Sequence, residues 1–164
     1  MTEETRAAAM LRSSSRLRDD ADFEAYERAV ELLAEGLDPR DLPAIYRAFD
    51  DGTEDYEVFW HLVHVVDKYD WRTAAKVYVD LLPETLPKAH EWMELLAIRQ
   101  VNHDEARGFL LEAARAAPAL NRDAVRSLLV GLASERDSDA DRALALKAEQ
   151  ALQDLDGGPE QQSR

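Results

Sequence analysis

Hydrophobic residues along this chain recur every three or four positions, a spacing typical of amphipathic helices rather than strands. The clearest such segment runs from Tyr56 to Val66. One face of that helix would carry the apolar residues Phe59, Leu62, Val63 and Val66. Another face would carry the polar residues Glu57, His61, His64 and Lys68. Because no stretch alternates apolar and polar residues between hairpin turns, we predict an all-α fold.

Residues that favour helix starts recur at intervals of roughly 14 to 19 positions from Asp38 onward. Asp38-Pro39 is the clearest of them, since an aspartate cap is followed by proline at the first helical position. The other predicted starts are Asp20 or Asp22, Thr53, Asp70, Thr85 or Leu86, Asn102, Asn121 and Ser138. Because proline disfavours a continuing helix, we place the end of one helix at Leu82, before Pro83.

Pairs of helices at this spacing form hairpins of about 34 residues, which is the period of stacked helical repeats. The tetratricopeptide consensus is not reproduced at a fixed offset. We therefore predict a HEAT-like α-solenoid of stacked antiparallel hairpins, with about eight helices. Its core should bury large apolar residues of the later helices, namely Trp92, Leu95, Leu96, Leu110, Leu111, Leu128 and Leu129.

A length of 164 residues suits one domain with a continuous core. We predict a single helical-repeat domain over residues 19–155. The N-terminal segment 1–18 is predicted to be partly mobile, although a short helix around Arg6–Leu17 also fits its pattern. The tail 156–164 contains no apolar residue, so we predict that it is disordered.

Charge is the strongest global feature of the chain. The net charge is −14, from 34 acidic and 20 basic residues. The first 18 residues hold four arginines and two glutamates, so they carry +2 and the rest of the chain carries −16. Such a surface repels nucleic acid. It attracts a basic protein partner and raises the rate at which the two proteins associate. The alternative is that the acidity serves solubility alone.

Composition excludes several classes of protein. The absence of cysteine excludes a disulfide framework, a zinc finger, an iron–sulfur site and a thiol nucleophile. The first residues lack the basic and then apolar pattern of a secretion signal. The apolar runs are far shorter than the roughly 20 residues that span a bilayer. We therefore predict a cytoplasmic protein that does not bind membranes.

No set of residues along the chain matches a catalytic or cofactor-binding motif. His61 and His64 are spaced to share a metal, but the two residues between them are aliphatic, unlike the His-Glu-x-x-His pattern. The turn that begins at Asp50 fails the EF-hand pattern, because Gly52 is its third residue rather than its sixth. The serines lack a nucleophile elbow and the glycines form no phosphate-binding loop. We predict no enzyme activity, no metal and no cofactor.

The acidic turn before Tyr56 is the main candidate for binding a partner. Together with the polar face of the helix that follows, it would form one acidic, imidazole-bearing patch. The predicted residues of this patch are Asp50, Asp51, Glu54, Glu57, His61 and His64. The alternative is that these carboxylates only favour the dipole at the helix start and touch no partner.

Two other groups of residues are interpreted as structural. The tryptophans Trp60, Trp71 and Trp92 are expected to be core or groove-lining anchors, because the surrounding negative charge disfavours stacking on nucleic-acid bases. Arg99 and Asn102 are expected to bond the turn that follows their helix.

Several short motifs occur in order in the middle of the chain. They are Asp38-Pro39, the run from Phe49 to Val58, Leu62-Val63-His64, Ala89-His90-Glu91-Trp92, Arg99 and Asn102. In order and spacing, from about Leu32 to Leu111, they resemble the immunity protein 30 family of bacterial polymorphic toxin systems. Two departures stand out. Relatives tend to have Ile-Leu-Asn directly after the arginine, whereas this chain has Gln100-Val101-Asn102. Relatives more often have a Met or Trp and a Gly before Leu-Val-His, whereas this chain has Phe59-Trp60-His61.

The resemblance implies a non-enzymatic protein that protects its producer by binding a cognate toxin domain stoichiometrically. The acidic surface would suit a basic toxin, and a nuclease would meet that description. One alternative is a helical-repeat adaptor or scaffold for another basic protein. A metal-dependent enzyme is a third class, and the oligomeric state is left open.

Overall fold

A computed structural model describes residues 5–53, 55–134 and 137–157 of the protein. Within these residues the chain forms nine α-helices and one short 3-10 helix, and it contains no strand. The predicted all-α class is confirmed, with one α-helix more than the eight expected. In the tail for which disorder is predicted, residues 158–164 lie outside the described part, whereas Asp156 and Gly157 belong to the last helix.

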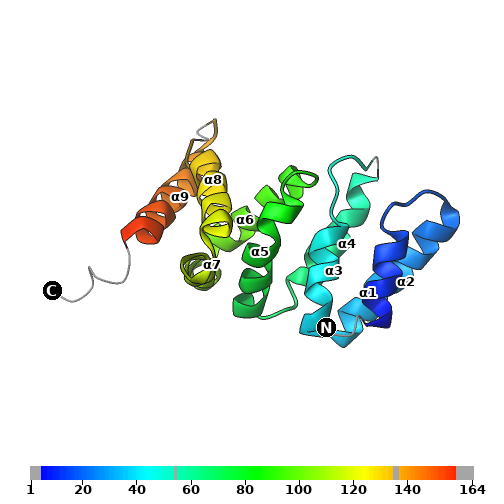
Figure 1. Ribbon diagram of the computed structural model, residues 1–164. Coiled ribbons are helices and arrows are strands. Elements are labelled where there is room, and N and C mark those ends of the chain that lie inside the picture. The colour runs from blue at the N-terminus through cyan, green and yellow to red at the C-terminus, as the bar shows by residue number, and fades with distance from the viewer. Residues whose placement is uncertain (1–4, 54, 135–136, 158–164) are drawn as a thin grey trace.

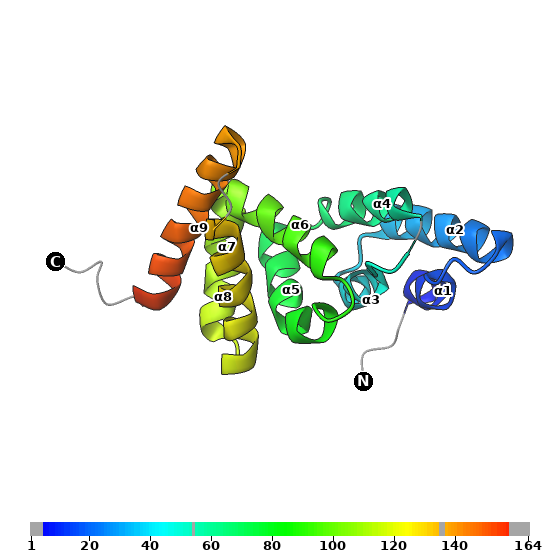
Figure 2. The same ribbon diagram turned by 90° about the horizontal axis from the view of Figure 1, so that it is seen from above.

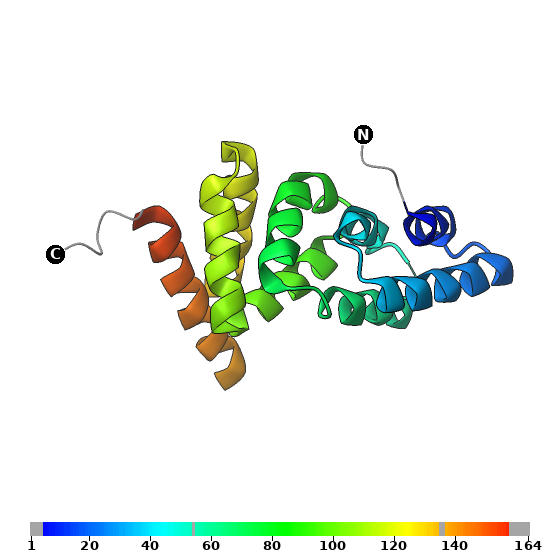
Figure 3. The same cartoon turned by 90° about the horizontal axis from the view of Figure 1, so that it is seen from below.

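The helices follow one another in space in roughly the order of the chain, from α1 and α2 at one end to α8 and α9 at the other (Figure 1 and, from below, Figure 3). Their bounds are α1 (Arg6–Ser14), α2 (Asp20–Gly36), α3 (Leu42–Ala48), α4 (Tyr56–Val66), α5 (Trp71–Thr85), α6 (His90–Asn102), α7 (Asp104–Ala116), α8 (Ala119–Ser134) and α9 (Asp139–Gly157), with the 3-10 helix η1 (Pro39–Asp41) before α3. Seen from above, α1, α3 and α5 form one row, and α2, α4 and α6 form a second (Figure 2).

The turns that join α1 to α2, α3 to α4 and α5 to α6 lie along one edge of the molecule, the upper edge in Figure 1. We call this the turn edge; its described residues are 15–19, 49–53, 55 and 86–89. The turns lie together because α1, α3 and α5 all point toward this edge and each following helix runs back from it. Segments far apart in the sequence therefore become neighbours there.

Packing between helices is regular at the two ends of the molecule and less so in the middle. At one end α1 packs against α2 and α3, and at the other α8 packs against α9. In the middle, α5 packs more extensively against α7 and α8 than against α6. At the N-terminal end, Leu11 of α1 is fully buried in the core. The predicted partial mobility of residues 1–18 and the boundaries of the predicted domain stay predictions.

The centre of the core is an aromatic cluster that joins four elements. The ring of Trp92 on α6 lies 5.4 Å from Phe49 and 5.5 Å from Phe59, measured between ring centroids. Tyr26 on α2 meets Phe59 edge-on at 6.2 Å. Trp92 is fully buried, and so are most of the residues predicted to form the core. Only Leu95 departs from that prediction, since it is half-buried and packs against the edge of the core.

Three buried tyrosines connect helices through their hydroxyl groups. Tyr26 donates to the backbone carbonyl of Val58 at 3.1 Å, and Tyr78 donates to that of Met93 at 2.7 Å. Tyr46 makes the same kind of bond to α5 at 3.1 Å. Each hydroxyl is thereby satisfied within the core, and burial raises the pKa of all three phenols.

The helix α5 continues through Pro83 to Thr85, so the predicted end at Leu82 is wrong. Pro83 has no N–H, which leaves the carbonyl of Val79, four residues earlier, without its helical donor. The side-chain amide of Asn121 on α8 supplies that donor at 2.9 Å, and it also lies 3.0 Å from the carbonyl of Asp80. Asn121 was predicted to cap a helix; its side chain instead donates to the backbone carbonyl that Pro83 leaves without a donor.

The predicted helix caps are partly confirmed. The side chains of Asp38, Asp70 and Ser138 each accept a backbone N–H at the start of a helix, at 2.9, 2.9 and 3.1 Å. The cap predicted at Asn102 is wrong, because the imidazole of His103 accepts from the backbone of α7 instead.

Candidate partner-binding site

The acidic turn begins with a local hydrogen bond. The carboxylate of Asp50 accepts the backbone N–H of Gly52 at 2.8 Å, which folds the chain back on itself. A Cβ added to Gly52 would lie 3.1 Å from that same carboxylate oxygen, so glycine leaves room for the bond. Asp50 and Asp51 are exposed, whereas Glu54 lies outside the described residues.

Asp51 attaches this turn to the start of α6. Its backbone N–H donates to the carbonyl of Lys88 at 2.9 Å. Its carboxylate accepts the backbone N–H of Glu91, in the first turn of α6, at 3.0 Å. The residue that precedes α6 is Ala89, which has no side chain to cap the helix. Asp51 therefore caps α6 from another part of the chain, a role that the sequence patterns did not indicate.

The helix α4 carries the other predicted residues on its exposed face. Glu57, His61 and His64 are all exposed and follow one another at helical spacing. The imidazole of His64 lies 4.0 Å from the carboxylate of Asp67. The structure thus brings these three residues together on α4, with Asp50 and Asp51 in the turn that leads into it. The described residues contain no group of three imidazoles and carboxylates that could hold a metal ion.

An exposed aromatic ring lies where the acidic turn meets α4. Tyr56 is 41 % exposed and stacks on the buried ring of Trp92, with 4.3 Å between the centroids. Partial burial, followed by the nearby carboxylates of Glu91 and Asp51, raises the pKa of its phenol. A ring held by stacking and surrounded by acids can anchor a partner's surface. Sequence analysis missed Tyr56, although its position directly after the acidic turn was a usable signal.

Two contacts hold α4 and α6 together beside this face. Trp60 meets Trp92 edge-on at 6.0 Å, and the guanidinium of Arg99 donates to the carboxylate of Asp67 at 3.1 Å. Trp60 and Asp67, the residue that follows α4, are seven positions apart, and so are Trp92 and Arg99, so α4 and α6 run in the same direction there. Arg99 was expected to bond the turn after its helix; its side chain instead joins the two helices.

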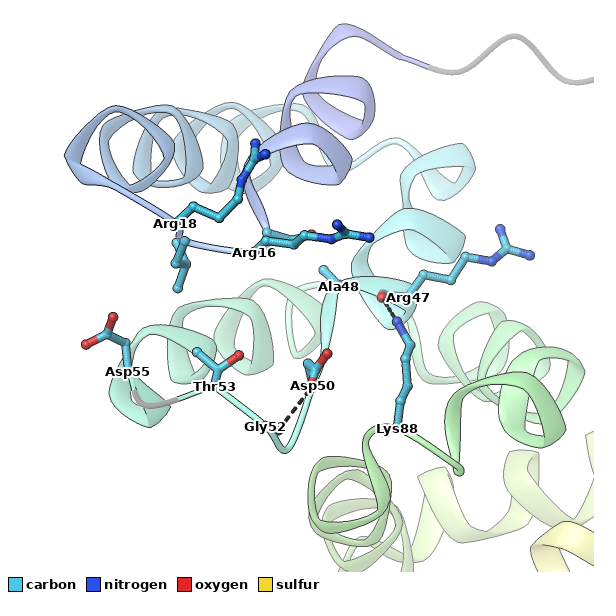
Figure 4. A pocket seen from close by; sticks show the side chains of 11 residues that line it. Arg16, Arg18, Arg47, Ala48, Asp50, Gly52, Thr53, Asp55 and Lys88 are labelled. Atoms are coloured by element: carbon cyan, nitrogen blue, oxygen red, sulfur yellow. Dashed lines mark hydrogen bonds between the residues drawn. The ribbon is translucent and has the colours of Figure 1, made fainter.

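A cleft of about 740 Å³ opens along the turn edge, with the acidic turn as one wall (Figure 4). We call it the turn-edge cleft. Asp50 and Asp55 line the acidic wall, and Arg16 and Arg18, from the turn between α1 and α2, line the opposite wall. Two further cations line it, Arg47 at the end of α3 and Lys88 before α6. The acidic turn therefore faces basic residues, which sequence analysis did not foresee.

The cations of the turn-edge cleft differ in how they are neutralised. Arg18 forms an ion pair with Asp22 at 2.8 Å, and Arg47 forms one with Glu84 at 2.7 Å. The hydrogen bond from Arg47 lowers the pKa of that glutamate. By contrast, the ammonium group of Lys88 donates to the backbone carbonyl of Arg47.

The turn-edge cleft and the exposed face of α4 both lie within the part of the chain that matches a known family. The sequence model of immunity protein 30 matches residues 13–110, well over half of the chain. No curated protein and no solved structure matches the chain. None of the helices in the described residues has the length and apolar character needed to cross a membrane. The match confirms the predicted resemblance and extends it toward the N-terminus: the chain belongs to the immunity protein 30 family.

Proposed function

We propose that this protein neutralises a cognate bacterial toxin domain by binding it stoichiometrically, and so protects the cell that produces it. The observation that carries this proposal is the family match over residues 13–110, which includes α2 to α6 and the whole turn-edge cleft. Family membership indicates an immunity protein. The toxin, its basic surface and the mode of inhibition are our inference.

The distribution of charge supports a basic toxin. A net charge of −14 gives the protein a long-range attraction for a cationic surface, and a nuclease offers one where it binds phosphates. The exposed carboxylates of the acidic turn and of Glu57, with the imidazoles of α4 and the exposed ring of Tyr56 beside them, would meet that surface. Aromatic anchors within a polar rim are typical of tight protein interfaces.

The proposal treats the fold as a non-enzymatic scaffold. We propose that the helices act as a HEAT-like stack, which presents successive turns to a partner along one edge. Binding would inhibit the toxin by covering its functional surface, so no catalytic group is required of this chain.

The test uses the toxin domain encoded next to this protein's gene. Cells that express the toxin domain should survive when the protein is co-expressed, and a titration of purified toxin should reach full inhibition near one equivalent. A structurally intact, unrelated acidic protein is the control, because it tests for inhibition by charge alone. Inhibition at a small fraction of an equivalent would point to an enzyme that modifies the toxin. A stable partner recovered from cells without any toxin gene would favour an adaptor.

A further inference from the structure

The turn-edge cleft is basic in its lining although the protein as a whole is acidic. Four cationic side chains and two carboxylates line it among its described residues, in a chain with 34 acidic and 20 basic residues. The cations come from two turns and the end of α3, with Arg16 and Lys88 more than seventy positions apart in the sequence. The fold therefore collects positive charge at one place on a negative surface.

Two of these cations form no ion pair with a carboxylate within the described residues. Arg18 and Arg47 are already paired with Asp22 and Glu84. The guanidinium of Arg16 makes no ion pair or hydrogen bond to the described chain, and its side chain runs along the cleft in Figure 4. Lys88 donates to a backbone carbonyl, and its charge also helps to lower the pKa of Glu84, but it forms no ion pair with that carboxylate. Both groups therefore keep donors available for an anion that enters the cleft.

The surroundings decide which anion fits. Asp50 and Asp55 form the opposite wall, and the rest of the surface is strongly acidic, so an extended polyanion such as nucleic acid is repelled. A single carboxylate carried by an otherwise basic protein does not meet that repulsion. Its basic surroundings would face the acidic exterior, while the carboxylate itself would meet Arg16 and Lys88.

We propose that the turn-edge cleft binds an aspartate or glutamate side chain of the toxin domain, with Arg16 and Lys88 as determinants of specificity. This inference rests on the proposed function. A toxin with a neutral or basic residue at that position would leave the two cations covered and unpaired, which disfavours the wrong partner. Long-range attraction alone lacks this selectivity, because any basic toxin would be drawn to a surface of this charge.

The experiment compares two double variants by their dissociation constants for the neighbouring toxin domain. Arg16→Glu with Lys88→Glu should weaken binding by about tenfold or more. The matched control is Arg28→Glu with Lys76→Glu, which changes the net charge equally at exposed ion pairs outside the cleft. The control should bind a basic toxin as well as the wild type or more tightly, so only the cleft variant is expected to lose affinity.

The possible outcomes separate the two levels of the proposal. Wild-type protein that does not bind the toxin overturns the proposed function and this inference with it. If the wild type binds and the cleft variant binds equally well or more tightly, the inference alone is overturned.

Arg16→Gln is a second variant, which removes the charge without adding a carboxylate and should also weaken binding. Each acidic residue of the toxin is then changed to lysine, and one such change should restore binding to Arg16→Glu; rescue by none of them contradicts the proposal.

Discussion

At the scale of single residues, Pro83 and Asn121 form one structural unit although they lie on different helices. The proline leaves the carbonyl of Val79 without a helical donor, and the amide of Asn121 supplies one at 2.9 Å. Asn121→Ala should therefore lower the free energy of unfolding by about 1–3 kcal/mol, the cost of an unsatisfied polar group. Chemical denaturation measures this loss.

The double variant gives the control for this prediction. Pro83→Ala restores a backbone N–H that can donate to Val79, so Asn121→Ala should cost clearly less in that background. Equal losses in both backgrounds would mean that Asn121 acts through packing rather than through this hydrogen bond.

At the scale of elements, the acidic turn and α6 depend on each other through Asp51. Its carboxylate caps α6 at the N–H of Glu91, which the preceding alanine cannot do. Asp51→Ala should cost about 0.5–2 kcal/mol of unfolding free energy, whereas Asp51→Asn should cost little because an amide oxygen also accepts. Thermal or chemical denaturation distinguishes the two variants. The control Asp50→Ala removes a bond only within the turn. A loss at Asp50 as large as that at Asp51 would contradict the capping role.

The elements also show what the sequence could predict. Periodicity places α4 and its exposed Glu57, His61 and His64 because those positions lie within one helix, where spacing fixes the face. The cap on α6 and the bond at Pro83 could not be predicted, because each joins residues about forty positions apart. Local patterns contain no information about such pairs. The turn-edge cleft could not be predicted for the same reason, because its lining residues lie up to about seventy positions apart. The sequence shows only that the start of the chain is rich in arginine.

At the scale of the whole molecule, the question is whether net charge alone directs the toxin to this protein or whether the face of α4 contributes locally. Asp50→Asn in the acidic turn with Glu57→Gln on α4 removes two exposed charges, and neither substitution removes the cap at Asp51. If the face meets a basic toxin, this variant should associate more slowly, and its association rate should depend less on ionic strength. Stopped-flow mixing at low and high salt measures both effects.

The control for this prediction lies at the other end of the molecule. Glu105→Gln on α7 with Asp123→Asn on α8 changes the net charge by the same amount at exposed positions. Long-range steering depends on the sum of charges, whereas a local contact depends on where they lie. A local role for α4 therefore requires the first variant to slow association more than the second. Equal rates for the two variants would assign the attraction to net charge rather than to a local contact with the acidic turn and α4.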